Sequence, residues 1–122
     1  MKLHASARTH LNTFTGYGEG YVMVNGERHA ASLIVQPERI AAWPLAAFAA
    51  LTEDHFARLA ALGPEVVLLG TGRRLRFPHP QLSAPLARAG IGLEVMDVQA
   101  ACRTYNILMA EERRVLAALI FE

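Results

Sequence analysis

Two short runs of apolar residues constrain the fold more than any other feature of the sequence. Val66–Leu69 is continuously apolar and bounded by turn residues, and Val115–Phe121 is a second run of the same kind. A strand that exposes one face alternates apolar and polar residues, whereas an unbroken apolar strand is buried on both faces. We therefore expect two inner strands of a sheet that is covered on both sides.

The residues around these runs predict an alternation of strands and helices. A short helix ending at Gly90 and a strand over Leu93–Met96 follow the first run, so the two strands should form a parallel pair with a right-handed crossover. Asp97 is expected to cap the next helix, from Val98 to about Ala110. Its apolar residues recur at helical spacing and should face the core: Val98, Ala101, Cys102, Tyr105, Leu108 and Met109.

The N-terminal half contains a strong hairpin signal. Asn25-Gly26 lies between Tyr21–Val24 and Arg28–Val35. Both turn residues tolerate positive φ, which predicts a tight hairpin with a type I′ turn. Gln36-Pro37 should end the second strand, because proline has no N–H to donate to a neighbouring strand.

An alanine-rich segment, Ile40–Leu51, has no clean helical or strand period. We interpret it as a short extended piece followed by a turn or helical stub. Its apolar side chains around Trp43 and Phe48 either close the core or form a binding patch, and the first interpretation is preferred. Thr52 then caps a helix that Gly63 ends.

The chain has 122 residues, of which 52% are hydrophobic. This is the usual size of one domain, and we expect residues 1–122 to form a single one. The element order predicts an α/β fold in which a mixed sheet lies in a layered domain. An N-terminal hairpin contributes one side, and a β-α-β-α-β half contributes the other.

Charge and cysteine content exclude several classes of function. The net charge is +1 and the charges are interspersed, which argues against a nucleic-acid-binding protein. Cys102 is the only cysteine, so no internal disulfide can form, and a reducing, cytoplasmic location is expected. No apolar run approaches the roughly 20 residues of a membrane span, and Met1–His10 lacks the apolar core of a signal peptide.

Metal-ligand spacing is also missing from the sequence. No two histidines are three or four residues apart, and none pairs with the cysteine at metal spacing, so we expect neither metal nor cofactor. The histidines are His4, His10, His29, His55 and His79.

One candidate cleft emerges from the predicted topology. In open α/β sheets ligands bind at the carboxyl ends of strands, where a glycine-rich loop and the cap of the last helix should meet. Polar residues of that helix add to the set, which consists of Gly70, Thr71, Gly72, Asp97, Arg103 and Asn106. The plainer interpretation is preferred: a turn that needs positive φ, a helix cap and a solvated face. The nearby Arg73, Arg74 and Arg76 are interpreted as a solvated turn.

The C-terminal half also carries an ordered series of motifs. They are Leu68-Leu69-Gly70-Thr71-Gly72, Ala89-Gly90-Ile91-Gly92-Leu93-Glu94-Val95-Met96-Asp97, Ala101-Cys102-Arg103-Thr104-Tyr105-Asn106-Ile107-Leu108, and Glu112-Arg113-Arg114-Val115 with Ala117-Ala118-Leu119. This series resembles the small family of unknown biochemical function that includes the mitochondrial complex I assembly factor 3, an animal adipogenesis-associated protein, and bacterial and archaeal members. The resemblance covers nearly the whole chain.

The resemblance implies a three-layer α/β fold with a five-stranded mixed sheet, in which the last strand lies inside and antiparallel to its neighbours. The family that the chain resembles has no established enzyme activity or cofactor. The mitochondrial member of that family helps to build respiratory complex I with partner proteins. We therefore expect a non-enzymatic assembly or protein-interaction module with an unidentified protein partner. A small-molecule or anion-binding protein, or a weak enzyme, using the Gly70–Gly72 loop is the alternative. A structural subunit of a homo-oligomer is the third hypothesis.

Overall fold

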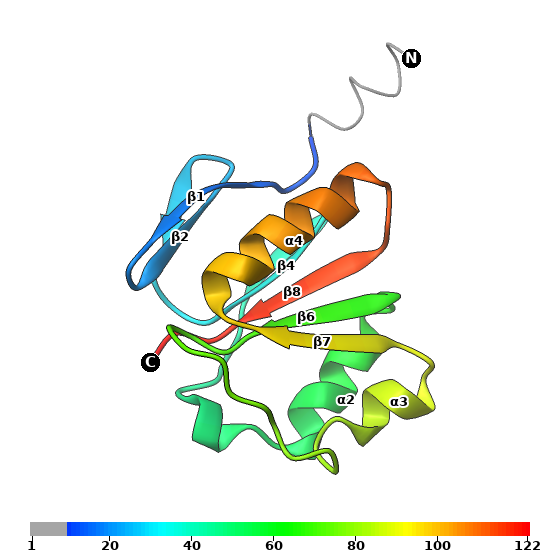
Figure 1. Ribbon diagram of the computed structural model, residues 1–122. Coiled ribbons are helices and arrows are strands. Elements are labelled where there is room, and N and C mark those ends of the chain that lie inside the picture. Colours follow the sequence, from blue (N-terminus) through cyan, green and yellow to red (C-terminus); the bar gives the residue numbers. More distant parts are fainter. Residues whose placement is uncertain (1–9) are drawn as a thin grey trace.

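The computed structural model describes residues 10–122, in which a five-stranded main sheet lies between two layers (Figure 1). The main sheet has the strand order β5-β4-β8-β6-β7, and a separate small sheet has the order β1-β2-β3. The strands are β1 (Phe14–Gly18), β2 (Tyr21–Val24), β3 (Glu27–His29), β4 (Leu33–Gln36), β5 (Arg39–Ala42), β6 (Val66–Gly70), β7 (Gly92–Met96) and β8 (Val115–Leu119). The helices are the 3-10 helix η1 (Phe48–Ala50), α2 (Glu53–Ala61), α3 (Ala84–Arg88) and α4 (Val98–Ala110). This confirms the predicted α/β fold class with its β-α-β-α-β C-terminal half.

The two apolar runs form inner strands, as predicted. Every residue of β6 and β8 is buried. β6 runs parallel to both β7 and β8. Alternate residues of each inner strand enter opposite core clusters, so Leu68 and Leu69 face different layers. An unbroken apolar sequence is what a strand with two covered faces requires.

Different elements cover the two faces of the main sheet. On one face lie α4 and the small sheet, and Phe14 of β1 meets Tyr105 of α4 edge to face at 5.0 Å between ring centroids. On the other face lie α2 and α3, which contribute Phe56 and Leu86, together with Trp43 from the segment after β5. Figure 1 shows α4 on one side of the sheet and α2 with α3 on the other.

The predicted turn and caps are confirmed. Asn25 and Gly26 have φ of 52° and 82°, as a type I′ hairpin turn requires. The Thr52 side chain accepts from the N–H of His55, whose ring in turn accepts from the N–H of Thr52. Asp97 Oδ1 accepts from the N–H of Ala100 at 2.9 Å.

The N-terminal half departs from the sequence-based prediction at one strand. Arg28–Val35 is not continuous, since β3 and β4 belong to different sheets. The chain crosses between the sheets at Ser32, whose hydroxyl accepts from the N–H of Phe121 at 3.0 Å. Strand β1, which was not predicted, completes the small sheet. His4 and the other residues before His10 lie outside the described residues.

The last strand corrects two further expectations. β8 is antiparallel to β4 but parallel to β6, so it is not antiparallel to both neighbours. The strand ends at Leu119 and not at Phe121 as expected. The N–H of Ile120 still donates to Gly70 O at 2.9 Å, but Ile120 and Phe121 are not part of the strand. Between residues 10 and 122, no helix combines the length and apolar character needed to cross a membrane.

The Ile40–Leu51 segment closes the core. Trp43, Leu45 and Leu51 are 6%, 7% and 6% exposed and pack into the cluster beneath α2. These buried side chains close the core, as the preferred interpretation expects, and Trp43 cannot form the centre of a binding patch; that the exposed residues of Ala41–Leu51 bind a partner stays a prediction. The Trp43 indole has no access to a partner because it lies against the protein's own core.

Candidate functional site

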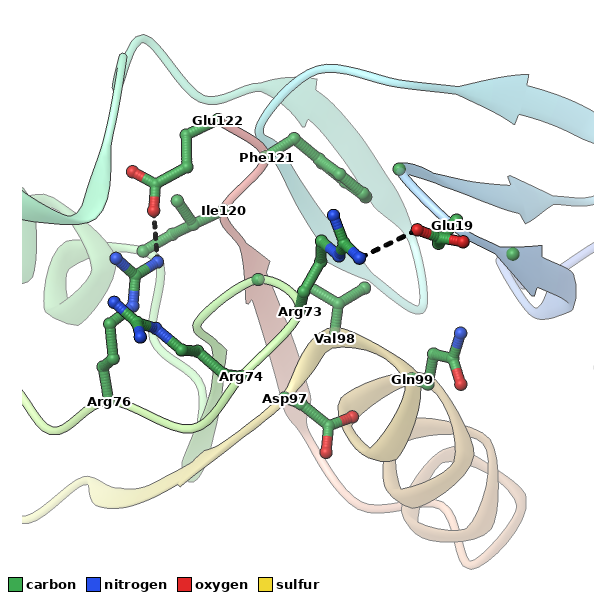
Figure 2. Close-up of a pocket in the computed structure, with 13 residues that line it drawn as sticks. Glu19, Arg73, Arg74, Arg76, Asp97, Val98, Gln99, Ile120, Phe121 and Glu122 are labelled. Atoms are coloured by element: carbon green, nitrogen blue, oxygen red, sulfur yellow. Dashed lines mark hydrogen bonds and ion pairs between the residues drawn. The ribbon is translucent and has the colours of Figure 1, made fainter.

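A cavity of about 570 Å³ lies where four segments of the chain meet (Figure 2). These segments are the turn between β1 and β2, the loop after β6, the first turn of α4, and the residues that follow β8. The lining residues are Gly18, Glu19, Gly20, Gly72, Arg73, Arg74, Arg76, Asp97, Val98, Gln99, Ile120, Phe121 and Glu122. The cavity thus gathers the carboxyl ends of β6, β7 and β8, the edge where parallel strands usually present ligand sites.

Backbone hydrogen bonds join the loop after β6 to the start of α4. Thr71 N donates to Met96 O at 2.9 Å, and Val98 N donates to Gly72 O at 3.0 Å. Gly70 allows this close approach, since a Cβ there would lie 2.8 Å from Leu119 Cδ2 and 3.2 Å from Val98 Cα. Gly72 has a φ of 93°, a conformation that disfavours other residues.

A buried threonine shapes the segment 71–76, which we call the arginine loop. Thr71 is fully buried, and its hydroxyl donates to Arg74 O at 2.7 Å while accepting from Arg76 N at 3.1 Å. Arg76 Nη2 also donates to Thr71 O at 2.8 Å. These bonds fix the course of the loop and hold the Arg76 guanidinium beside the cavity.

Arg76 forms an ion pair with Glu122 at the cavity, and both side chains also contact Phe48. Its Nη2 pairs with Glu122 Oε1, and Glu122 Oε2 accepts from the N–H of Phe48 at 3.1 Å. The guanidinium also lies over the Phe48 ring, 4.6 Å from its centroid. The hydrogen bond from Arg76, followed by that from Phe48, lowers the pKa of the Glu122 carboxyl below its ordinary value.

The other two arginines are more exposed. Arg73 Nη2 pairs with Glu19 Oε1 at 2.9 Å, with side chains that are 81% and 78% exposed, so this pair contributes little to stability. The guanidinium of Arg74 makes no hydrogen bond or ion pair with residues 10–122. Figure 2 shows Arg76 with Glu122, and Arg73 with Glu19, as two separate pairs. Three carboxylates, Glu19, Asp97 and Glu122, balance the three arginines of the lining.

The residues of the predicted cleft are divided between two places. Gly72 and Asp97 line the cavity. Gly70 and Thr71 directly precede Gly72 in the sequence, but they are buried and do not line the cavity. That these residues bind a ligand stays a prediction.

The remaining two predicted residues, Arg103 and Asn106, lie outside the lining and contact β1. Arg103 Nη1 donates to the hydroxyl of Tyr17 at 3.0 Å. Asn106 Oδ1 accepts from the N–H of Phe14 at 3.0 Å, and its Nδ2 donates to Phe14 O at 2.7 Å. The amide thus pairs with one residue of β1 as a neighbouring strand would, which fastens the small sheet to α4.

Sequence reasoning underrated the arginines and missed their acidic partners. Arg73, Arg74 and Arg76 directly follow the glycine pair, and their density beside a strand end was the available signal. Glu19 and Glu122 carry no such signal, because only the fold brings them to the loop. Arg76 departs from a solvated turn, with a side chain that is 26% exposed.

The arginine side chains of the lining can bind anions and hydrogen-bond acceptors, while three carboxylates of the same lining compete for them. Within residues 10–122, no three His, Cys, Asp or Glu side chains are grouped to hold a metal ion. Cys102 lies on the buried face of α4, and burial raises the pKa of its thiol to about 12. This holds the sulfur in the unreactive thiol form at neutral pH.

The sequence and the fold are both similar to those of known proteins. Residues 14–120 match the family described as "Protein of unknown function (DUF498/DUF598)". The chain is 33% identical over 106 residues to the NADH dehydrogenase (ubiquinone) 1 alpha subcomplex assembly factor 3 of Bos taurus, which covers 85% of this chain but only 58% of that protein. An uncharacterised protein of Rhodobacter capsulatus is 36% identical, over 86% of this chain and 81% of its own length. A crystal structure of a Bordetella parapertussis protein has a TM-score of 0.86 at 47% identity, and the match covers 92% of this chain and 97% of that one.

Proposed function

Because the chain belongs to the DUF498/DUF598 family, some of whose relatives are named as complex I assembly factors, we propose that it is a non-enzymatic assembly or protein-interaction module. The chain spans 58% of the bovine relative's length, so a link to respiratory complex I is part of this proposal. The proposed site of action is the cytoplasm, where a single unpaired cysteine is stable.

The observation that carries the proposal is an exposed apolar pair at the end of the arginine loop. Leu75 is 50% exposed and Phe77 is 70% exposed. They lie on either side of Arg76 in the sequence, and Arg76 lines the cavity. Aromatic side chains and arginines dominate the binding energy of protein interfaces, and an aromatic ring left in water gains most when a partner covers it. We propose that Leu75, Phe77 and the cavity form the binding face.

Quantitative affinity capture from the organism that encodes the protein tests this proposal. Phe77→Glu should remove a specific set of captured proteins, because a charge in place of the ring cannot be desolvated at an interface. The matched control is Ile107→Glu on α4, since Ile107 is also exposed, at 60%, but does not line the cavity. Capture of the same proteins by wild type and Phe77→Glu, with both folded, contradicts the proposed face.

A binding protein for small anions is the second candidate. The cavity volume of about 570 Å³ falls within the range of roughly 300–1,000 Å³ that is typical of ligand pockets. A free anion would have to compete with the carboxylates of the lining, two of which already pair with Arg73 and Arg76. We therefore rank this candidate second. Thermal denaturation with millimolar phosphate, citrate or glutamate is the test. A saturable rise in melting temperature that Arg74→Gln removes would favour it over the first candidate.

A further inference from the structure

We propose that the cavity recognises an acidic side chain of the partner protein, and that Glu122 occupies the position of that side chain until the partner displaces it. The position, which we call the carboxylate seat, consists of the Arg76 guanidinium and the backbone N–H of Phe48. The inference rests on the proposed function and adds the chemistry of the partner: a segment with a glutamate or aspartate next to an apolar residue.

The seat is built to hold a carboxylate at a defined place. Arg76 is fixed from behind by its hydrogen bonds to Thr71 and from the side by the Phe48 ring. The backbone N–H of Phe48 donates to Oε2 of the same Glu122 carboxylate at 3.1 Å. A preorganised guanidinium and a backbone donor on two different segments give a carboxylate two anchors at once.

Glu122 uses only part of this seat. It contacts Arg76 through Nη2, which is also bonded to Thr71 O. The neighbouring Nε is buried and has no hydrogen-bond partner among residues 10–122. A guanidinium binds carboxylates best through two parallel N–H donors, so the contact with Glu122 leaves donor capacity unused. In the proposed complex the partner's carboxylate takes the place of Glu122 and bonds to Nε as well, and because Nε is buried, the side chains around it must shift for this second bond to form.

The residues around the carboxylate seat indicate which other side chains the partner segment should carry. Arg74 also acts on the Glu122 carboxyl and has no ion pair of its own within the described residues, so it adds attraction for an acidic segment. Val98, Ile120 and Phe121 supply apolar lining to the cavity beside the seat. Leu75 and Phe77, the two chain neighbours of Arg76, are exposed apolar residues. A partner segment that combines an acidic and an apolar side chain matches both properties.

The test is a titration of the 122-residue chain with the acetylated and amidated tripeptide Ile-Phe-Glu, followed by NMR at the amides of Phe48 and Arg76. This probe reproduces residues 120–122 and carries one side-chain carboxylate. The tripeptide Ile-Phe-Gln is its uncharged control. The first variant is Glu122→Gln, which removes the charge of the side chain that occupies the seat. The second and third are Arg76→Gln and the milder Arg76→Lys. The control is Arg88→Gln, which removes an exposed arginine that pairs with Glu53 elsewhere.

We expect Glu122→Gln to bind the Glu probe about tenfold more tightly than wild type, the equivalent of one charge-assisted hydrogen bond that no longer has to be broken. Arg76→Gln and Arg76→Lys should reduce binding to the level of the Gln probe, and Arg88→Gln should bind as wild type does. Equal binding by Glu122→Gln and wild type, or by Arg76→Lys and Arg88→Gln, overturns the inference. Affinity capture separates the two proposals: partners lost in Phe77→Glu but retained in Arg76→Lys leave the proposed function standing without the carboxylate seat.

Discussion

Asn106 on α4 helps to attach the small sheet to the rest of the domain. Its amide satisfies both backbone groups of Phe14 at 3.0 and 2.7 Å, 92 residues away in the sequence. Asn106→Ala leaves two part-buried backbone groups without partners, and we expect the free energy of unfolding to fall by about 1–3 kcal/mol. Urea denaturation measures this loss. Gln99→Ala, an exposed position on the same helix, should change stability by less than about 0.5 kcal/mol, and an equal effect of the two substitutions would contradict the role of Asn106.

Glu122 provides a pH-dependent signature of the carboxylate seat. Its pKa is lowered by Arg76 and then by the Phe48 N–H, so the contact stabilises the fold above the ordinary glutamate pKa. This contribution is lost as the pH falls through the lowered value. An NMR titration of the Glu122 carboxyl should give a midpoint below that of a glutamate in an unstructured peptide. Arg76→Gln should raise the midpoint and Arg88→Gln should not; an unchanged midpoint in Arg76→Gln would show that Arg76 does not hold the carboxylate.

Cys102 should be chemically inert in the folded protein. Burial raises the pKa of its thiol to about 12, an effect that Asp97 reinforces and the neighbouring Arg103 opposes. At pH 8 a disulfide reagent should therefore react much more slowly with the native protein than with the protein in guanidinium chloride. Native and unfolded rates that agree would mean that the thiol is accessible.

The junction between β6 and α4 tolerates no side chain at Gly70. A Cβ there would meet Leu119 Cδ2 at 2.8 Å and Val98 Cα at 3.2 Å. Gly70→Ala should therefore destabilise the protein by about 1–3 kcal/mol through overpacking. Gly92 in β7 is the matched control, because its added Cβ would meet its nearest neighbours at 3.8 Å. Similar denaturation midpoints for Gly70→Ala and Gly92→Ala would be incompatible with this packing.

The elements that could be predicted from sequence are those whose signal is local. β6 and β8 are unbroken apolar runs, and the caps at Thr52 and Asp97 need only the residues that follow them. β1 was missed because Phe14–Gly18 contains two glycines and is anchored by a distant asparagine. The split of Arg28–Val35 was missed because no glycine or proline marks the crossing between the sheets.

The strand and helix order predicted from the sequence indicated the edge of the domain where the cavity lies. Parallel strands place the loop after β6 beside the start of α4, which brought Gly72 and Asp97 together in the prediction as in the structure. The partners of the arginines could not be predicted, because Glu19 comes from the small sheet and Glu122 from beyond β8. Arg103 and Asn106 were assigned to the cleft because their helix begins there, but their positions in α4 direct them to β1.

In the proposed function, another protein covers the face formed by the arginine loop and Phe77. Photo-crosslinking in the native organism tests it most directly, with p-benzoylphenylalanine placed at Phe77 in one strain and at Ile107 in another. Both side chains are exposed, at 70% and 60%, so the chance of random crosslinking is similar. We expect a recurrent protein partner to be crosslinked from position 77 and not from position 107. No crosslinked protein at position 77, or the same proteins at equal yield from position 107, would contradict it.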